Sequence, residues 1–155
     1  MTAAARAALL RVEIDAVLAD WAYHLDHLEL DELAGLFTED ALLVTGALEL
    51  RGRAEIKNRY RERTVVRSTR HTYSGLRVTA LAGGPERRVR ARSTWVNYAA
   101  NAPVPLDDVG VYLVADFDDV LTWCPDERWR ISERRISPVF RDPSRAPARN
   151  LGFSE

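Results

Sequence analysis

The chain has 155 residues, of which 46% are hydrophobic and 29% are charged, and its formal net charge at pH 7 is −1. These values fit one compact domain with a buried core, and the near-neutral charge argues against a protein that binds nucleic acid or another polyanion. The single cysteine, Cys124, excludes an internal disulfide and a cysteine metal cluster. No apolar run approaches the ~20 residues of a transmembrane helix, and charged residues soon follow the alanine-rich start, so we expect a cytoplasmic protein with no membrane partner.

Helical periodicity dominates the first part of the chain. Residues 5–25 place Ile14, Val17, Trp21 and Leu25 on one stripe. A neighbouring stripe consists of Val12, Ala16, Ala19, Tyr23 and Asp26, and we expect it to carry Asp26 inward. A short helix at 29–37, a hairpin of 41–44 with 48–50, and an arginine-rich helix at 54–63 with a solvated face are predicted to follow.

Strand patterns occupy the second part of the chain. They cover residues 71–81, 87–100, 109–122 and 128–140, and glycine or proline marks the connections between them. Helices followed by strands favour an α+β fold over βαβ repeats. No interdomain linker is visible, so residues 1–155 are expected to form one domain with an extended tail from about residue 141. The tail is expected to lie on the surface or on a partner subunit.

Alternation within these strands predicts which side chains face inward. Two sets of alternating residues are assigned to the interior: Val89, Ala91, Ser93, Trp95 and Asn97 in one strand, and Val111, Leu113, Ala115 and Phe117 in the next. Asp116 and Asp118 then fall on the solvated face. A buried Asn97 needs a hydrogen-bond partner, which a ligand could supply. Trp95, Asn97, Val111, Leu113 and Phe117 are therefore candidates to line a largely apolar pocket.

The strand at 71–81 has a conflicting pattern. His71 and Tyr73 share a face with Arg77, whereas Leu76 and Val78 take the other face. A bulge at Gly75 would exchange the two faces, because glycine inside a strand often marks a bulge. Without such a bulge, His71 would lie on the surface.

Asp26 and His71 are the candidate catalytic residues. A carboxylate that accepts a hydrogen bond from Nδ1 fixes the imidazole and makes Nε2 a better base, which is sufficient equipment for removing a proton without a cofactor. The alternative is that each residue is structural. Tyr23 and Tyr73 could donate hydrogen bonds to a substrate carbonyl, or could bury only their rings with the hydroxyl at the rim.

No cofactor or metal site is predicted. His24 and His27 are three residues apart and could join Asp26 or Asp31 around a metal ion, but they lack further convergent ligands. The Gly83-Gly84 pair leads into Pro85 and strand-like residues instead of the helix that a nucleotide-binding loop requires.

Three segments carry a family resemblance: residues 25–41 (LDHLELDELAGLFTEDA), 51–56 (RGRAEI) and 70–78 (RHTYSGLRV). In their order and spacing they resemble the SnoaL-like branch of the nuclear transport factor 2 superfamily. This resemblance implies a cone, in which three helices pack against a strongly curved mixed sheet and leave a cavity open at one end.

The same resemblance implies a chemistry. Asp26 and His71 look like the catalytic pair of scytalone dehydratase, bile-acid dehydratase and hexachlorocyclohexane dehydrochlorinase, with Asp26 orienting the base His71. Those enzymes add groups such as a second histidine on a later strand, where this chain has apolar residues near Val111 and Leu113. The implied protein is a cofactor-independent lyase of the dehydratase type for a small, largely apolar cyclic or polyketide-like substrate of secondary metabolism. Isomerases and polyketide cyclases begin with the same step and stay open.

A second resemblance gives a different function. Residues 129–136 (WRISERRI) and 150–153 (NLGF) look like the small β subunits of ring-hydroxylating dioxygenases, which share the cone fold and are usually structural. The chain has no Rieske or iron-ligand motif of its own. For a free-standing enzyme we expect a homodimer or small homo-oligomer, whereas a subunit would assemble with a larger oxygenase chain.

Overall fold

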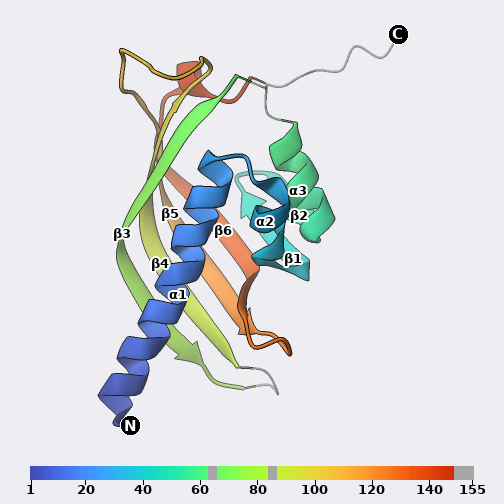
Figure 1. The fold of residues 1–155 in the computed structure, drawn as a ribbon, viewed down its shortest axis with the longest axis vertical. Helices are drawn as coiled ribbons and strands as arrows, with labels where there is room; N and C mark the ends of the chain where they lie inside the picture. Colours follow the sequence, from blue (N-terminus) through green and yellow to red (C-terminus); the bar gives the residue numbers. More distant parts are fainter. Residues whose placement is uncertain (63–65, 84–86, 149–155) are drawn as a thin grey trace.

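The computed structural model describes residues 1–62, 66–83 and 87–148, and Figure 1 shows its α+β architecture. The described residues form three α-helices, which are α1 (Ala3–Asp26), α2 (Leu30–Gly35) and α3 (Arg53–Arg61). The first two precede the strands, and α3 follows β2. The strands are β1 (Phe37–Thr45), β2 (Leu48–Arg51), β3 (Ser68–Leu81), β4 (Arg88–Ala100), β5 (Val111–Trp123) and β6 (Trp129–Arg141). The predicted elements are thus confirmed, with shifted ends. The helix end predicted at 63, the turn around Pro85 and the segment 150–153 lie outside the described residues.

The six strands form one curved mixed sheet in the order β2-β1-β6-β5-β4-β3. β1 runs parallel to β6, and every other neighbouring pair is antiparallel. Figure 1 shows α1 crossing the sheet in front of β3 and β4, while α2 and α3 lie beside it near β1 and β2. All three helices therefore cover the same concave face. No helix in the described part of the chain is long and apolar enough to cross a membrane.

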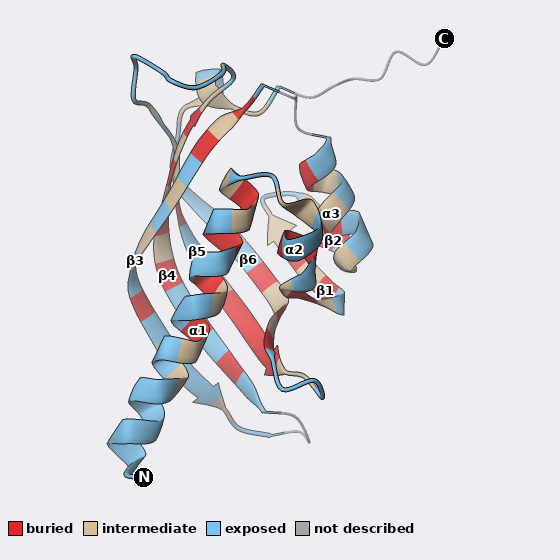
Figure 2. Ribbon diagram, viewed as in Figure 1, coloured by how far each residue is buried: buried red, intermediate tan, exposed pale blue. Residues whose placement is uncertain are grey.

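Asp26 points inward from α1, but it belongs to a different row of side chains from the one that the sequence predicted. Its buried residues are Ile14, Leu18, Trp21, Ala22 and Leu25, and the side facing the sheet is visible as the buried face in Figure 2. The predicted stripe of Val12, Ala16, Ala19 and Tyr23 is exposed. Asp26 instead continues the i, i+4 row through Leu18 and Ala22, which points toward the sheet. The expectation about Asp26 was right, but the stripe that supported it was wrong.

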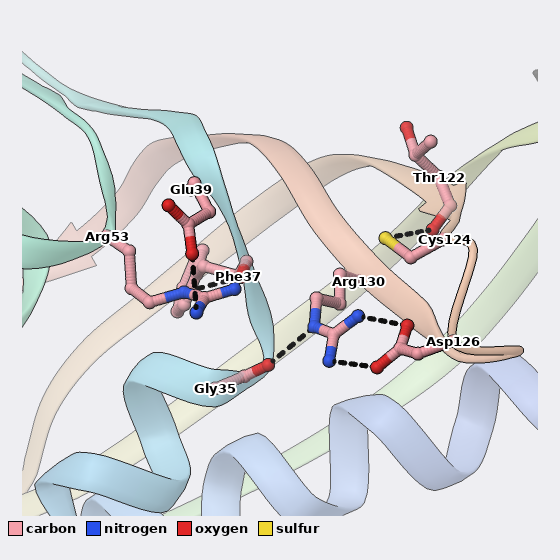
Figure 3. Close-up of polar contacts among 8 residues, drawn as sticks. All are labelled: Gly35, Phe37, Glu39, Arg53, Thr122, Cys124, Asp126 and Arg130. Atoms are coloured by element: carbon pink, nitrogen blue, oxygen red, sulfur yellow. Dashed lines mark hydrogen bonds and ion pairs between the residues drawn. The ribbon is translucent and has the colours of Figure 1, made fainter.

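Two arginines fix the junction between α2 and β1, as Figure 3 shows. Arg53, at the start of α3, donates through Nε and Nη2 to the carbonyl of Phe37, at 3.0 and 2.6 Å. Arg130, on β6, donates to the carbonyl of Gly35 at 3.0 Å and forms a two-point ion pair with Asp126 at 2.6 and 2.7 Å. The bond to Gly35 satisfies a carbonyl at the end of a six-residue helix, where intrahelical partners are missing, and the bonds to Phe37 fix the first residue of β1. They hold β1, which supplies part of the cavity wall.

The turn that contains Cys124 has a structural role. Its Sγ lies 3.7 Å from the carbonyl of Thr122 (Figure 3), and its backbone N–H donates to Arg128. The side chain of Cys124 is half-buried. The turn that contains it closes the hairpin of β5 and β6.

The residues after β6 turn back over the sheet. Pro143–Arg145 forms a single 3-10 turn, and Asn101 donates to the carbonyl of Ala146 at 2.8 Å. Ala146 and Pro147 reach the rim of the cavity. The tail is thus not fully extended up to residue 147, because local hydrogen bonds bend it onto its own domain.

Candidate active site

Asp26 and His71 meet at the end of α1 and the start of β3. His71 Nδ1 lies 2.6 Å from Asp26 Oδ1, and the backbone N–H of His71 donates to Asp26 Oδ2 at 2.8 Å. Thr69 donates from its hydroxyl to Asp26 Oδ1 at 2.7 Å. The side chains of His71 and Asp26 are only 5% and 6% exposed. One carboxylate therefore holds the same histidine by both its ring and its backbone.

Electrostatics keep Asp26 ionised. Burial alone would raise the pKa of this carboxyl group, but the hydrogen bond and charge of His71, together with the Thr69 hydroxyl, outweigh burial and hold the pKa below its ordinary value. An ionised Asp26 accepts the Nδ1 hydrogen, which leaves Nε2 as the basic nitrogen of the neutral ring. This arrangement is suited to accepting a proton from a ligand.

The predicted bulge at Gly75 is confirmed, and it explains the strand's conflicting pattern. Between Ser74 and Arg77, β3 contributes one more residue than β4 to the pairing, and Gly75 has a φ of +66°. The extra residue exchanges the two faces of the strand. His71 consequently shares the inner face with Leu76, although the two are five residues apart.

A cavity of about 550 Å³ lies between α1 and the concave face of the sheet. His71 lines it, and so do four of the predicted ligand-binding residues: Trp95, Asn97, Leu113 and Phe117. Trp21 packs edge-on against His71, with 5.4 Å between ring centroids, and also lines the cavity. His71 thus lies in a cavity wall that also carries the aromatic rings of Trp21, Trp95 and Phe117.

Tyr23 and Tyr73 are placed away from the cavity, which corrects their predicted role. Tyr23 is 54% exposed and stacks on His27, with 4.1 Å between centroids. Tyr73 stacks on Trp95, and its hydroxyl donates to the Asp15 carboxylate at 2.8 Å. Burial and this hydrogen bond raise the pKa of Tyr73. Tyr73 therefore supports a wall residue and is already engaged by α1.

Val111 was also wrongly assigned to the cavity wall. It is 40% exposed, because β5 has an extra residue, Tyr112, between the pairs Asn97–Leu113 and Tyr98–Val111. The bulge interrupts simple alternation, turns Val111 outward and lets both Tyr112 and Leu113 line the cavity. Gly110, two residues before Tyr112, is the nearest sequence feature that could have indicated it.

A buried ion pair beneath the cavity was missed by the sequence analysis. Asp119 and Arg134 are both fully buried and bond at two points, with N–O distances of 2.7 and 2.8 Å. The Arg134 guanidinium lies 4.9 Å from the Phe117 ring centroid. Asp119 continues the inward row of Ala115 and Phe117, so extending the alternation by one step would have found it.

The two histidines considered as metal ligands, His24 and His27, form hydrogen bonds with protein groups. His24 Nδ1 lies 2.6 Å from Glu29, and His27 Nδ1 lies 2.8 Å from the carbonyl of Tyr23. Within the described ranges, no three His, Cys, Asp or Glu side chains converge as a metal site would require.

The fold and the site together define an α+β cone with a buried carboxylate–imidazole pair in its cavity. The SnoaL-like domain model matches residues 6–135, and the chain belongs to this family. No curated protein sequence matches it.

Three solved structures illustrate the shared fold. A variant of Rv3472, a protein of unknown function from Mycobacterium tuberculosis, has a TM-score of 0.77 at 20% identity over 98% of this chain and 85% of its own. A protein from Novosphingobium aromaticivorans named as a predicted scytalone dehydratase has a TM-score of 0.73 at 20% identity. The match covers 97% of this chain and 99% of that protein. The β subunit of a predicted aromatic-ring-hydroxylating dioxygenase from the same organism has a TM-score of 0.72 at 17% identity. The match covers 92% of this chain and 99% of the subunit. At these identities the likeness concerns the fold.

Proposed function

We propose that the protein is a cofactor-independent lyase of the dehydratase type, acting on a small, largely apolar cyclic molecule. The observation that carries the proposal is the 2.6 Å contact between His71 Nδ1 and Asp26 inside a cavity of about 550 Å³. A structural subunit has no need for a buried, carboxylate-supported imidazole in its cavity. The fold alone does not distinguish the two roles, because both an assigned dehydratase and an assigned oxygenase subunit share it.

In this mechanism His71 removes a proton from the carbon beside a carbonyl group. Asp26 stabilises the imidazolium that forms, and Asn97 donates a hydrogen bond to the developing enolate oxygen. The electron pair of the enolate then forms the C=C bond as the β-hydroxyl group leaves. The imidazolium returns its proton to the departing oxygen, so the products are an enone and water. An isomerase or cyclase would share the first step and differ only in the fate of the enolate.

Two ketones test these steps separately. In heavy water, 1-tetralone should exchange its C2 hydrogens faster with the protein than in buffer, which reports on proton abstraction alone by mass spectrometry. With 3-hydroxy-1-tetralone, abstraction at C2 and loss of the C3 hydroxyl give 1-naphthol and water, which reports on elimination by fluorescence. His71→Ala should slow exchange at least ~10²-fold, the lower end for a general base.

His27→Ala is the matched control, because His27 is exposed and its ring bonds only to the carbonyl of Tyr23 in the described structure. It should leave both rates unchanged. Exchange without elimination would favour the isomerase or cyclase. Exchange that is no faster than in buffer, or that survives in His71→Ala, would contradict the proposed base.

For the assembly we propose a homodimer or small homo-oligomer. Val139 and Phe140, near the end of β6, are 52% and 69% exposed and provide apolar surface for self-contact. Light scattering after size exclusion would measure the mass. Stable co-purification with a larger oxygenase chain would favour the subunit role.

A further inference from the structure

We propose that the substrate is an organic acid, whose anionic group binds Arg141 at the cavity mouth while its apolar body reaches His71. The assignment of the reacting end rests on the proposed function. The anion site itself rests on the sheet geometry and on the charges around the cavity.

The strand register places four cavity residues in one row. His71 on β3 pairs with Asn97 on β4, Asn97 pairs with Leu113 on β5, and Leu113 pairs with Arg141 on β6. All four line the cavity. Neighbouring strands are ~4.8 Å apart, so the backbones of His71 and Arg141 are separated by roughly 14 Å. The row thus presents a base, an amide, an apolar side chain and a cation in that order.

Arg141 owes its position in this row to a bulge in β6. The pairs Val114–Phe140 and Ala115–Pro138 leave Val139 as an extra residue. With strict alternation from the lining residues Ile136 and Pro138, Phe140 would face the cavity and Arg141 would face away. The extra residue reverses this outcome and exposes Phe140. Bulges of this kind commonly re-aim a side chain at a functional site.

The charge of Arg141 has no partner among residues 1–62, 66–83 and 87–148. Among the described residues its side chain forms no ion pair or hydrogen bond, whereas the other arginine of the cavity wall, Arg59, lies 3.5 Å from Glu62. Arg141 is exposed at the mouth, where a guanidinium stays hydrated until a ligand arrives. Its planar set of donors suits a carboxylate, which can accept two parallel hydrogen bonds.

Asn97, which lies between His71 and Arg141 in this row, can form a hydrogen bond with the middle of the same ligand. It is 7% exposed, and its Oδ1 has no hydrogen-bond partner among the described residues. A buried amide oxygen without a partner is costly, and a ligand in the cavity can satisfy it. Leu113, Trp95 and Phe117 provide apolar contact around it. A flat ring system with one acidic group and one hydroxyl group, which can donate to Asn97 Oδ1, fits this sequence of contacts.

A matched pair of fluorescent probes tests the anion site. 1-Anilinonaphthalene-8-sulfonate and N-phenyl-1-naphthylamine share one ring skeleton and differ by the sulfonate, which stands in for a carboxylate. The protein should bind the sulfonate more tightly than the neutral probe at low salt. Arg141→Gln should weaken sulfonate binding by about tenfold, the scale of one charge-assisted contact, and change neutral binding less than twofold.

Three further variants locate the effect. Arg135→Gln removes the same charge from an exposed position on the same strand, where Arg135 pairs with Glu133, and should change neither affinity. Leu113→Trp narrows the cavity and should weaken both probes. His71→Ala should keep the preference for the sulfonate, so the anion site can stand even if the proposed base fails. Equal affinities for the two probes, or an equal loss in Arg135→Gln and Arg141→Gln, would overturn the proposal.

Discussion

The Arg134 guanidinium lies 4.3 Å from the centroid of the Trp21 ring, and Trp21 packs edge-on against His71. A single indole ring therefore separates a fully buried cation from the proposed base. Arg134 is fixed in turn by its two-point bond to Asp119. The ion pair therefore supports the aromatic ring that packs against His71.

Removing one member of this ion pair should lower the free energy of unfolding strongly, whereas replacing both members with apolar residues should change it little. Asp119→Asn leaves a buried cation without its counter-charge and should lower the free energy of unfolding by about 3–5 kcal/mol. Complete burial raises the pKa of Asp119 despite Arg134, which indicates that desolvation of the carboxylate outweighs its attraction to Arg134. Asp119→Leu combined with Arg134→Met should therefore be close to neutral. Urea unfolding measures all three proteins.

Asp118→Asn is the control for that series, because the partly exposed pair of Asp118 with Arg90 should contribute less than about 1 kcal/mol. An equal loss at positions 118 and 119 would show that burial does not decide the cost.

Asp26→Asn should lower the rate of 1-tetralone exchange by ~10²-fold or more, because an amide can stabilise the wrong tautomer of His71. The folded-state pKa of Asp26 is below its ordinary value, so its ionised form stabilises the fold above the unfolded-state pKa. This stabilisation is lost as the pH falls through the folded-state pKa. The difference in unfolding free energy between the native protein and Asp26→Asn should therefore shrink below about pH 4. A difference that stays constant down to pH 2 would contradict the pKa shift.

Thr69 should act as a positioning residue for Asp26. Thr69→Val keeps the shape of the side chain but removes the hydroxyl donor, and should slow exchange about fivefold, equivalent to ~1 kcal/mol. Thr69→Ser keeps the donor and should restore most of the rate. Thr122→Val is the control, because the Thr122 hydroxyl bonds to Ser132 in the β5–β6 pair. If Thr69→Ser is as slow as Thr69→Val, packing and not the hydrogen bond is responsible.

Tyr73→Phe should affect stability and leave the chemistry intact. The phenol group holds β3 to α1 through Asp15, and its loss should lower the free energy of unfolding by about 1 kcal/mol. The phenyl ring that remains in this variant would still stack on Trp95, so exchange of 1-tetralone should stay within twofold. A large loss of exchange at unchanged stability would show that Tyr73 binds the substrate after all.

Periodicity predicted the elements well and the cavity wall only in part. The β4 row from Val89 to Asn97 was correct because that stretch alternates without interruption. Gly75 was recognisable because glycine signals a bulge. Pro138, next to the extra residue Val139, was a comparable signal that was not used, since proline within a sheet is largely confined to edges and bulges. The bulges at Tyr112 and Val139 misplaced Val111 and concealed Arg141.

The contact between Asp26 and His71 could not follow from spacing, since the two residues are 45 positions apart. Only the resemblance to a family joined them before the structure was known. Asp119 was overlooked for a different reason: charged residues are assigned to solvent by default, and its partner Arg134 comes from another strand.

Residues that follow β6 also line the cavity. Ala146 and Pro147 form part of the cavity rim, and they are held there by Asn101 and by the bond from Arg67 to the carbonyl of Arg145 at 3.0 Å. A chain shortened after Arg141 would keep all six strands and the Asp26–His71 pair, but would lack the rim residues Ala146 and Pro147. The residues that line the rim and the carboxylate–imidazole pair thus belong to separate parts of the polypeptide, so the rim can be altered by substitution without changing Asp26 or His71.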